Sequence, residues 1–145
     1  MKKFELTNEF ITNSYGVKLF RIKALIEFGN VKAGDLGGYI EKEENLSHMG
    51  DAWVSDDARI SGDAQVFGDA RVSGDKDYAY AHGFGSCNRT TTFFRLKDGD
   101  VGVRCGCFYG TLAQFRDKVC ETHGETKKAQ EYLMLADLME IRFKN

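Results

Sequence analysis

Residues 50–73 read GDAWVS, DDARIS, GDAQVF and GDARVS, which are four six-residue repeats in one strict register. Each repeat has alanine in its third place and a β-branched aliphatic residue in its fifth. On a strand these two places point to the same side, so stacked repeats would build an inward column of small and branched side chains. The Gly-Asp or Asp-Asp pair that opens each repeat suits a sharp corner. A period of six with this pattern predicts a parallel β-helix, in which about three repeats close one coil.

The repeat period also predicts which side chains lie above one another. With a coil of about 18 residues, Val54 stacks on Val72 and Trp53 stacks on Arg71. Trp53 and Phe67 fall in outward places of the repeats. Large apolar side chains that point outward from a solenoid more often mark a subunit contact than a ligand site. We therefore predict that Trp53 and Phe67 lie in an oligomer interface.

The repeats resemble those of the hexapeptide-repeat family of left-handed parallel β-helices. The resemblance extends back more loosely through residues 44–49, where Leu46 and His48 take the inward places. The left-handed winding is implied by the resemblance alone. About two coils make a short solenoid, whose ends need caps or partner subunits. We therefore expect a homo-oligomer, specifically a homotrimer.

The chain divides into three parts. Residues 1–37 contain two short apolar strand candidates and are interpreted as an N-terminal β cap. Residues 38–76 form the predicted β-helix. Residues 34–38 are interpreted as a loop that leads into it. Residues 77–145 are interpreted as a C-terminal α+β module of the ββαα type. The expected fold class is therefore mixed β with an α/β tail, built around a short left-handed parallel β-helix.

The C-terminal part carries clear local signals. Asp98-Gly99 between two β-rich runs predicts a hairpin, and a two-residue loop would pair Phe94 with Val103. Thr111 to Gln114 has the form of a capping box and predicts the start of a helix, which Gly124 ends. A second helix is expected from Thr126 to about residue 143.

The loop from residue 83 to residue 92 is the best candidate for function. It combines glycines, hydroxyls, an amide and a guanidinium, and such loops form concavities that bind anions, phosphate above all. The alternative is a domain hinge with a surface arginine. The candidate ligand-binding residues are Ser86, Asn88, Arg89, Thr91, Thr92, Arg104 and His123. His123 lies in the last turn of a predicted helix, where capping of the helix dipole is the alternative to ligand contact.

A second resemblance covers nearly the whole chain. Residues 34–47, GDLGGYIEKEENLS, are similar to the entry segment of short phage and prophage proteins that continue into such hexads. The C-terminal part shares their motifs at Gly85-Ser86, Asn88, Thr91-Thr92-Phe93, Cys105-Gly106-Cys107-Phe108 and Thr122-His123-Gly124. Cys87 stands where that family usually has arginine, so either Arg89 takes over its role or the site is altered. The shared polar residues imply a pocket.

Composition limits the classes of partner. The formal net charge is −2 over 145 residues, so we expect no direct binding of nucleic acid and no membrane partner. Because a signal-peptide pattern is missing, we expect a cytoplasmic protein, in the host cell if it is phage-encoded. The four cysteines are then expected to be free thiols. Cys105 and Cys107 with histidines elsewhere invite a zinc interpretation, but their spacing favours buried cysteines, and we predict no metal and no cofactor.

Three functions compete at this stage. The first is a non-enzymatic accessory protein that binds an anionic, nucleotide-like ligand and, in a phage context, sequesters a host immune signal as a counter-defence. The second is a protein that inhibits a host defence protein, such as a CRISPR nuclease, by direct contact. The third is a hexapeptide acyltransferase. This function is disfavoured because about two coils offer little groove for a substrate and because no regular repeat contains a histidine that could act as a general base. Fold alone assigns none of them.

Overall fold

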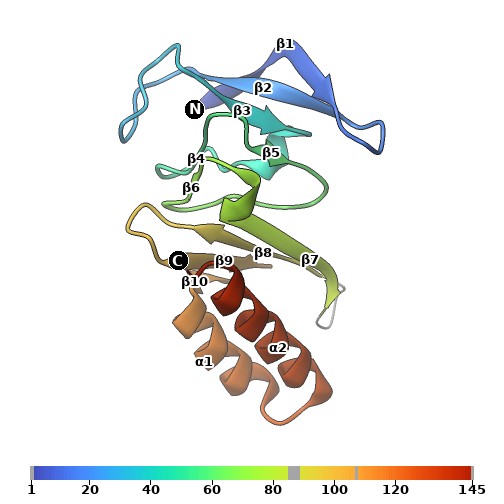
Figure 1. The fold of residues 1–145 in the computed structure, drawn as a ribbon. Coiled ribbons are helices and arrows are strands. Elements are labelled where there is room, and N and C mark those ends of the chain that lie inside the picture. Colours follow the sequence, from blue (N-terminus) through green and yellow to red (C-terminus); the bar gives the residue numbers. More distant parts are fainter. Residues whose placement is uncertain (1, 85–88, 107, 145) are drawn as a thin grey trace.

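The computed structural model describes residues 2–84, 89–106 and 108–144 and stacks the chain in layers (Figure 1). An N-terminal hairpin and the hexad segment come first, followed by a C-terminal sheet and then two helices. The strands are β1 (Phe4–Thr12), β2 (Lys18–Ala24), β3 (Leu36–Ile40), β4 (Trp53–Val54), β5 (Arg59–Ile60), β6 (Arg71–Val72), β7 (Tyr78–Phe84), β8 (Arg89–Arg95), β9 (Val101–Cys105) and β10 (Phe108–Thr111). The helices are α1 (Leu112–His123) and α2 (Lys127–Arg142), with short 3₁₀ turns at Glu43–Asn45 and Asp75–Asp77.

The prediction of a short left-handed parallel β-helix is wrong. The strands form mostly antiparallel and mixed sheets, in the orders β1-β2-β3-β5 and β10-β9-β8-β7, and only β4 and β6 form a small parallel sheet of their own. Each hexad strand is two residues long, so it contributes too little ladder to continue as a solenoid. The longer strands on either side, which pair antiparallel, therefore determine the architecture.

The inward places of the hexads are nevertheless buried as the pattern predicts. Each alanine and β-branched aliphatic of the four hexads is at most 1% exposed: Ala52, Val54, Ala58, Ile60, Ala64, Val66, Ala70 and Val72. Trp53 pairs with Arg71 and Val54 with Val72, at the predicted spacing. The prediction that Trp53 points outward from the repeats is wrong, because its side chain is only 4% exposed and its ring packs edge-on against Phe28 at 5.3 Å between centroids.

The segment expected to be an entry loop is the strand β3. It pairs antiparallel with β2 and parallel with β5, so it joins the N-terminal hairpin to the hexads in one sheet. Its glycines permit this close approach: a Cβ on Gly38 would lie 2.6 Å from the carbonyl oxygen of Ala58. The sequence pattern missed the strand because Gly37 and Gly38 read as loop residues, whereas here they allow tight packing.

The C-terminal sheet has four strands rather than the two of the expected ββαα module. Residues 78–84, which lie outside the predicted hairpin, form β7, and the β-rich run after Asp98-Gly99 divides into β9 and β10. The division falls at Gly106, whose φ of +59° lies in the left-handed region.

The β8–β9 hairpin is confirmed, but its register differs by one residue from the prediction. Phe93, not Phe94, pairs with Val103. The amide of Leu96 donates to the carbonyl of Asp100 at 2.8 Å, so the loop has three residues, with Gly99 at φ +91°. This is the turn with a glycine bulge that three-residue hairpin loops favour. A one-residue shift moves every side chain to the other face, so Phe93 points to the helices and Phe94 to the hexads.

Both helices form where the sequence predicts them. The hydroxyl of Thr111 accepts a hydrogen bond from the amide of Gln114, and Gly124 caps the other end of α1 at φ +58°. Thr126 caps α2 in the same way. The helices cover one face of the C-terminal sheet, and the hexad segment covers the other. In the described part of the chain, neither helix combines the length and apolarity that crossing a membrane requires.

Candidate functional site

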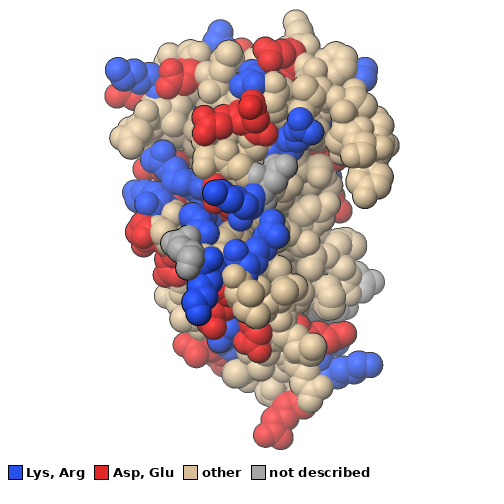
Figure 2. All heavy atoms as spheres, viewed as in Figure 1, with Lys and Arg blue, Asp and Glu red and all other residues tan. Residues whose placement is uncertain are grey.

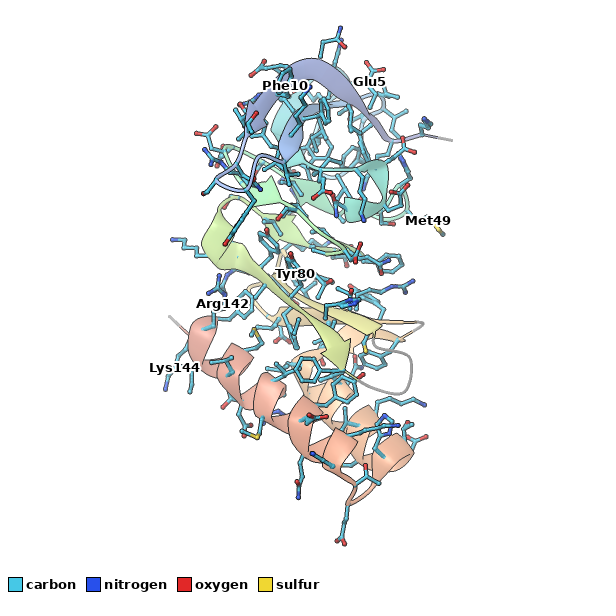
Figure 3. All side chains as sticks on the ribbon, turned by 90° about the vertical axis from the view of Figure 1, so that its right-hand side faces the viewer. Glu5, Phe10, Met49, Tyr80, Arg142 and Lys144 are labelled. Atoms are coloured by element: carbon cyan, nitrogen blue, oxygen red, sulfur yellow. The ribbon has the colours of Figure 1, made fainter. Side chains whose placement is uncertain are left out.

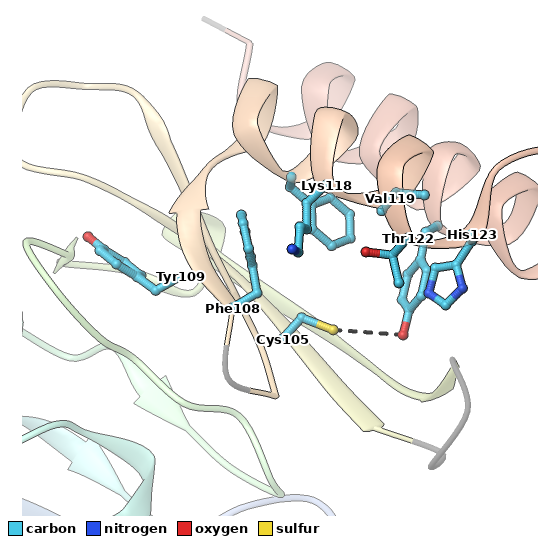
Figure 4. Close-up of a pocket in the computed structure, with 9 residues that line it drawn as sticks. Cys105, Phe108, Tyr109, Lys118, Val119, Thr122 and His123 are labelled. Atoms are coloured by element: carbon cyan, nitrogen blue, oxygen red, sulfur yellow. Dashed lines mark hydrogen bonds between the residues drawn. The ribbon is translucent and has the colours of Figure 1, made fainter.

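A pocket of about 480 Å³ lies between α1 and the edge of the C-terminal sheet (Figure 4). Strands β9 and β10 supply one wall and α1 supplies the other, with Tyr132 contributed by α2. The described residues that line it are Cys105, Phe108, Tyr109, Phe115, Lys118, Val119, Thr122, His123 and Tyr132. Its volume lies in the range of pockets that bind small molecules and cofactors.

The wall of the pocket is largely aromatic. The ring of Phe115 lies 5.9 Å from that of Phe108 and 5.6 Å, nearly perpendicular, from that of Tyr132. The His123 ring lies 5.8 Å from the Tyr132 ring at an angle of 31°. Edge-to-face and tilted pairs of this kind are favourable and hold the rings in place. A planar ligand in the pocket would therefore contact an apolar wall that is already formed.

Two buried hydrogen bonds hold the polar atoms behind this wall. The Thr91 hydroxyl donates to the Cys105 sulfur at 3.3 Å. Cys105 Sγ donates to the Tyr132 hydroxyl at 3.7 Å, which is the dashed contact in Figure 4. Thr91 is fully buried and Cys105 is 7% exposed. The thiol is thus bonded on both sides, which favours a packing role over nucleophilic attack.

Apart from the Cys105 thiol and two tyrosine hydroxyls, the polar side chains that line the pocket come from one helix. Lys118, Thr122 and His123 lie on the C-terminal half of α1, and Lys118 and Thr122 are one turn apart on the same face. Lys118 and Thr122 are exposed, and the Lys118 ammonium lies 3.7 Å from Glu121 in a solvent-accessible pair. Because an exposed pair of this kind is weak, the ammonium can turn to an anionic group in the pocket.

The predicted ligand-binding residues whose side chains the structure describes do not all line one site. Ser86 and Asn88 lie outside the described residues, and only the backbone of Arg89 is described, at the start of β8. Of the others, His123 lines the pocket and Thr91 lies behind it through Cys105. Thr92 and Arg104 are directed elsewhere.

Strand alternation separates Thr92 and Arg104 from the pocket. Neighbouring residues on a strand point to opposite faces, so Thr91 and Thr92 cannot line the same site. The Thr92 hydroxyl is buried and accepts a hydrogen bond from the amide of Gln65, on the hexad side. The Arg104 guanidinium lies over the Phe67 ring at 4.4 Å, and its Nε donates to Gln65 at 3.4 Å. These residues join the sheet to the hexads rather than bind at the pocket.

Phe67 is also largely covered within the chain. Besides the guanidinium, its ring meets the Tyr109 ring edge-on at 5.1 Å. The ring is partly buried and packs against the central core. The outward place in the repeat pattern therefore indicates a contact within the chain for this side chain, as it does for Trp53.

Two sequence motifs contain residues that line the pocket, so the motifs could have been used to predict it. Cys105 and Phe108 belong to one motif, Cys105-Gly106-Cys107-Phe108, and Thr122 and His123 belong to another, Thr122-His123-Gly124. The structure brings these two motifs together at one pocket. Lys118, Phe115 and Tyr132 were missed because nothing in their helical spacing distinguishes a pocket wall from core.

Comparisons with known proteins add no relative. No protein-family model matches the chain, and no curated protein matches it. Within residues 2–84, 89–106 and 108–144, no three His, Cys, Asp or Glu side chains are grouped so that they could hold a metal ion.

Proposed function

We propose that this chain is a non-enzymatic binding protein whose pocket between α1 and the C-terminal sheet takes a small, planar, anionic ligand of the nucleotide type. The observation that carries the proposal is the combination of an aromatic wall with Lys118, Thr122 and His123 along one helix. A largely apolar pocket with a few convergent polar groups is the usual form of a small-molecule site.

Each part of the pocket suits one part of such a ligand. Phe108 and His123 offer partly exposed ring surfaces against which a base could stack, an interaction that every base can make. Lys118 offers a cation to a phosphate, and Thr122 offers a hydroxyl. The volume of about 480 Å³ suits a mononucleotide or a compound of similar size. The resemblance to phage proteins extends the proposal to sequestration of a host immune signal.

Calorimetric titration with a panel of 5′-mononucleotides, 3′,5′-cyclic nucleotides and ADP-ribose tests the proposal. We expect at least one member to bind, and its parent nucleoside, which lacks phosphate, to bind more weakly. Lys118→Gln should weaken binding of the phosphorylated ligand by about tenfold, which corresponds to one charge-assisted hydrogen bond. The same variant should leave binding of the nucleoside unchanged. Thr122→Trp should abolish both by filling the pocket from an exposed position.

Lys127→Gln is the matched control. Lys127 is an exposed lysine at the start of α2 and does not line the pocket, so this variant removes the same charge without touching the site. A panel in which no compound binds, or binding that Thr122→Trp leaves intact, would refute the proposal.

A further inference from the structure

A second concave site lies where the hexads, the β8–β9 hairpin and the end of α2 meet. It has a volume of about 590 Å³ and shares no described residue with the aromatic pocket. Its lining is dominated by cations: Arg71, Lys76, Arg95, Lys97, Arg142 and Lys144. Figure 2 shows Lys and Arg gathered across the middle of the face in view, and Figure 3 shows Arg142 and Lys144 at the end of α2. This concentration is unexpected in a chain of net charge −2.

The one carboxylate among the described lining residues is already neutralised. Asp77 is 5% exposed, and its oxygens accept hydrogen bonds from the amide and hydroxyl of Ser73 and, at 3.3 Å, from Arg95 Nε. Burial raises the pKa of Asp77, but these hydrogen bonds and the Arg95 charge outweigh it and hold the pKa below its usual value. Asp77 therefore balances Arg95 and leaves the remaining cations of the site in excess.

Part of the arginine chemistry is structural. Arg95 Nη2 donates to the carbonyl of Phe143 at 3.1 Å, and Arg142 Nη2 donates to the carbonyl of Tyr78 at 3.1 Å. Arg95 thus satisfies the C-terminal end of α2, which favours a cation.

The lysines have no such structural role. Lys76 and Lys144 are exposed and form no ion pair within the described residues, whereas exposed Lys97 forms two long ion pairs, with Asp51 at 3.9 Å and with Asp69 at 4.0 Å. Arg71 Nε is buried and has no hydrogen-bond partner within the same part of the chain. The described lining thus carries six cations and one carboxylate, and such an excess of one sign in a concavity raises the local concentration of anions.

We propose that this basic site binds a small molecule that carries two or more linked phosphate groups. Several cations spread around one concavity match a multiply charged anion better than a single carboxylate. The described lining offers one apolar side chain, Leu96, and no aromatic ring, so it has no platform on which a base could stack. Single-stranded nucleic acid relies on such platforms, which the described lining of this concavity does not offer.

Calorimetric titration of the full chain with tripolyphosphate tests this site. We expect binding that exceeds that of orthophosphate and weakens as salt rises from about 50 to about 200 mM. The triple variant Lys76→Gln, Lys97→Gln and Lys144→Gln should weaken binding of tripolyphosphate by at least about tenfold, because it removes three of the cations of the site. The triple variant with arginine at the same positions should keep the binding, which shows that charge rather than a structural change is responsible.

Two controls separate this site from the aromatic pocket. Lys118→Gln should leave tripolyphosphate binding unchanged, and the triple glutamine variant should leave nucleotide monophosphate binding at the aromatic pocket unchanged. Equal tripolyphosphate binding by the wild type and the triple glutamine variant would contradict the proposal. So would tighter binding of a single-stranded oligonucleotide than of tripolyphosphate, which would assign the surface to nucleic acid. Absence of any tripolyphosphate binding at the lower salt concentration would also overturn it.

Discussion

Replacing Asn45 with alanine is expected to lower the free energy of unfolding by about 4 kcal/mol, because four buried or part-buried backbone groups would lose a hydrogen-bond partner. Asn45 is fully buried beside the hexads. Its Oδ1 accepts from the amides of Glu41 and Lys42 at 3.1 and 2.9 Å. Its Nδ2 donates to the carbonyls of Gly62 and Ala64 at 3.0 and 2.9 Å. One side chain therefore ties the end of β3 to the third hexad.

Equilibrium urea unfolding measures this effect, with Asn13→Ala as the matched control. The Asn13 Oδ1 also accepts two backbone hydrogen bonds, from Tyr15 and Val17, but in an exposed turn where water can replace it. We expect that control to cost less than about 1 kcal/mol. Asn45→Asp keeps the acceptors but turns a carboxylate toward two carbonyls, so it should destabilise nearly as much as alanine. Equal stabilities of Asn45→Ala and Asn13→Ala would show that the buried contacts are not formed.

Lys3 is expected to make the protein more stable as pH rises from 8 to 10. Its side chain is 1% exposed, its Nζ donates to the carbonyl of Ala52 at 2.6 Å, and it lies 4.6 Å from the centre of the Phe28 ring. Burial lowers its pKa to about 8, with Asp51 opposing and Arg71 adding to the shift. Between this pKa and the ordinary value of 10.5, the unfolded chain holds a proton that the native chain has released. The unfolding free energy contributed by Lys3 therefore increases with pH across this window.

Comparison with Lys3→Met isolates the Lys3 contribution from the other groups that titrate above pH 8. The difference in unfolding free energy between wild type and variant should change by about 2 kcal/mol in favour of the wild type between pH 7 and pH 10. Urea unfolding at these two pH values measures it. Lys127→Met, at an exposed position, should show no such change. A pH-independent difference for Lys3→Met would mean that the Lys3 ammonium is solvated in the native state.

The sequence predicted local structure well wherever a residue type favours one particular local structure. The alanine and β-branched places of the hexads are buried, Thr111 and Thr126 cap helices, and Gly124 ends α1. The fold class was predicted wrongly because the hexads dictate only two-residue strands. The long flanking strands pair antiparallel, and no periodic pattern marks that pairing.

The candidate site was predicted only in part, for geometric reasons. The ten-residue loop grouped polar residues that are neighbours in sequence, whereas strand alternation sends Thr91 and Thr92 to opposite faces. A binding pocket collects residues from separate elements, and the contacts of Tyr132 with Phe115 and Cys105 depend on how α2 packs. The net charge of −2 could not predict the basic site, because the cations of that site are scattered along the chain from Arg71 to Lys144.

The most direct test of the proposed function is a crystal structure of the full chain grown with the tightest-binding compound of the nucleotide panel. We predict that its base lies against the rings of Phe108 and His123 and that its phosphate lies within hydrogen-bonding reach of Lys118 Nζ. A bound compound located outside this pocket, or an empty pocket at a saturating concentration, would contradict the assignment of ligand binding to the aromatic site between α1 and the C-terminal sheet.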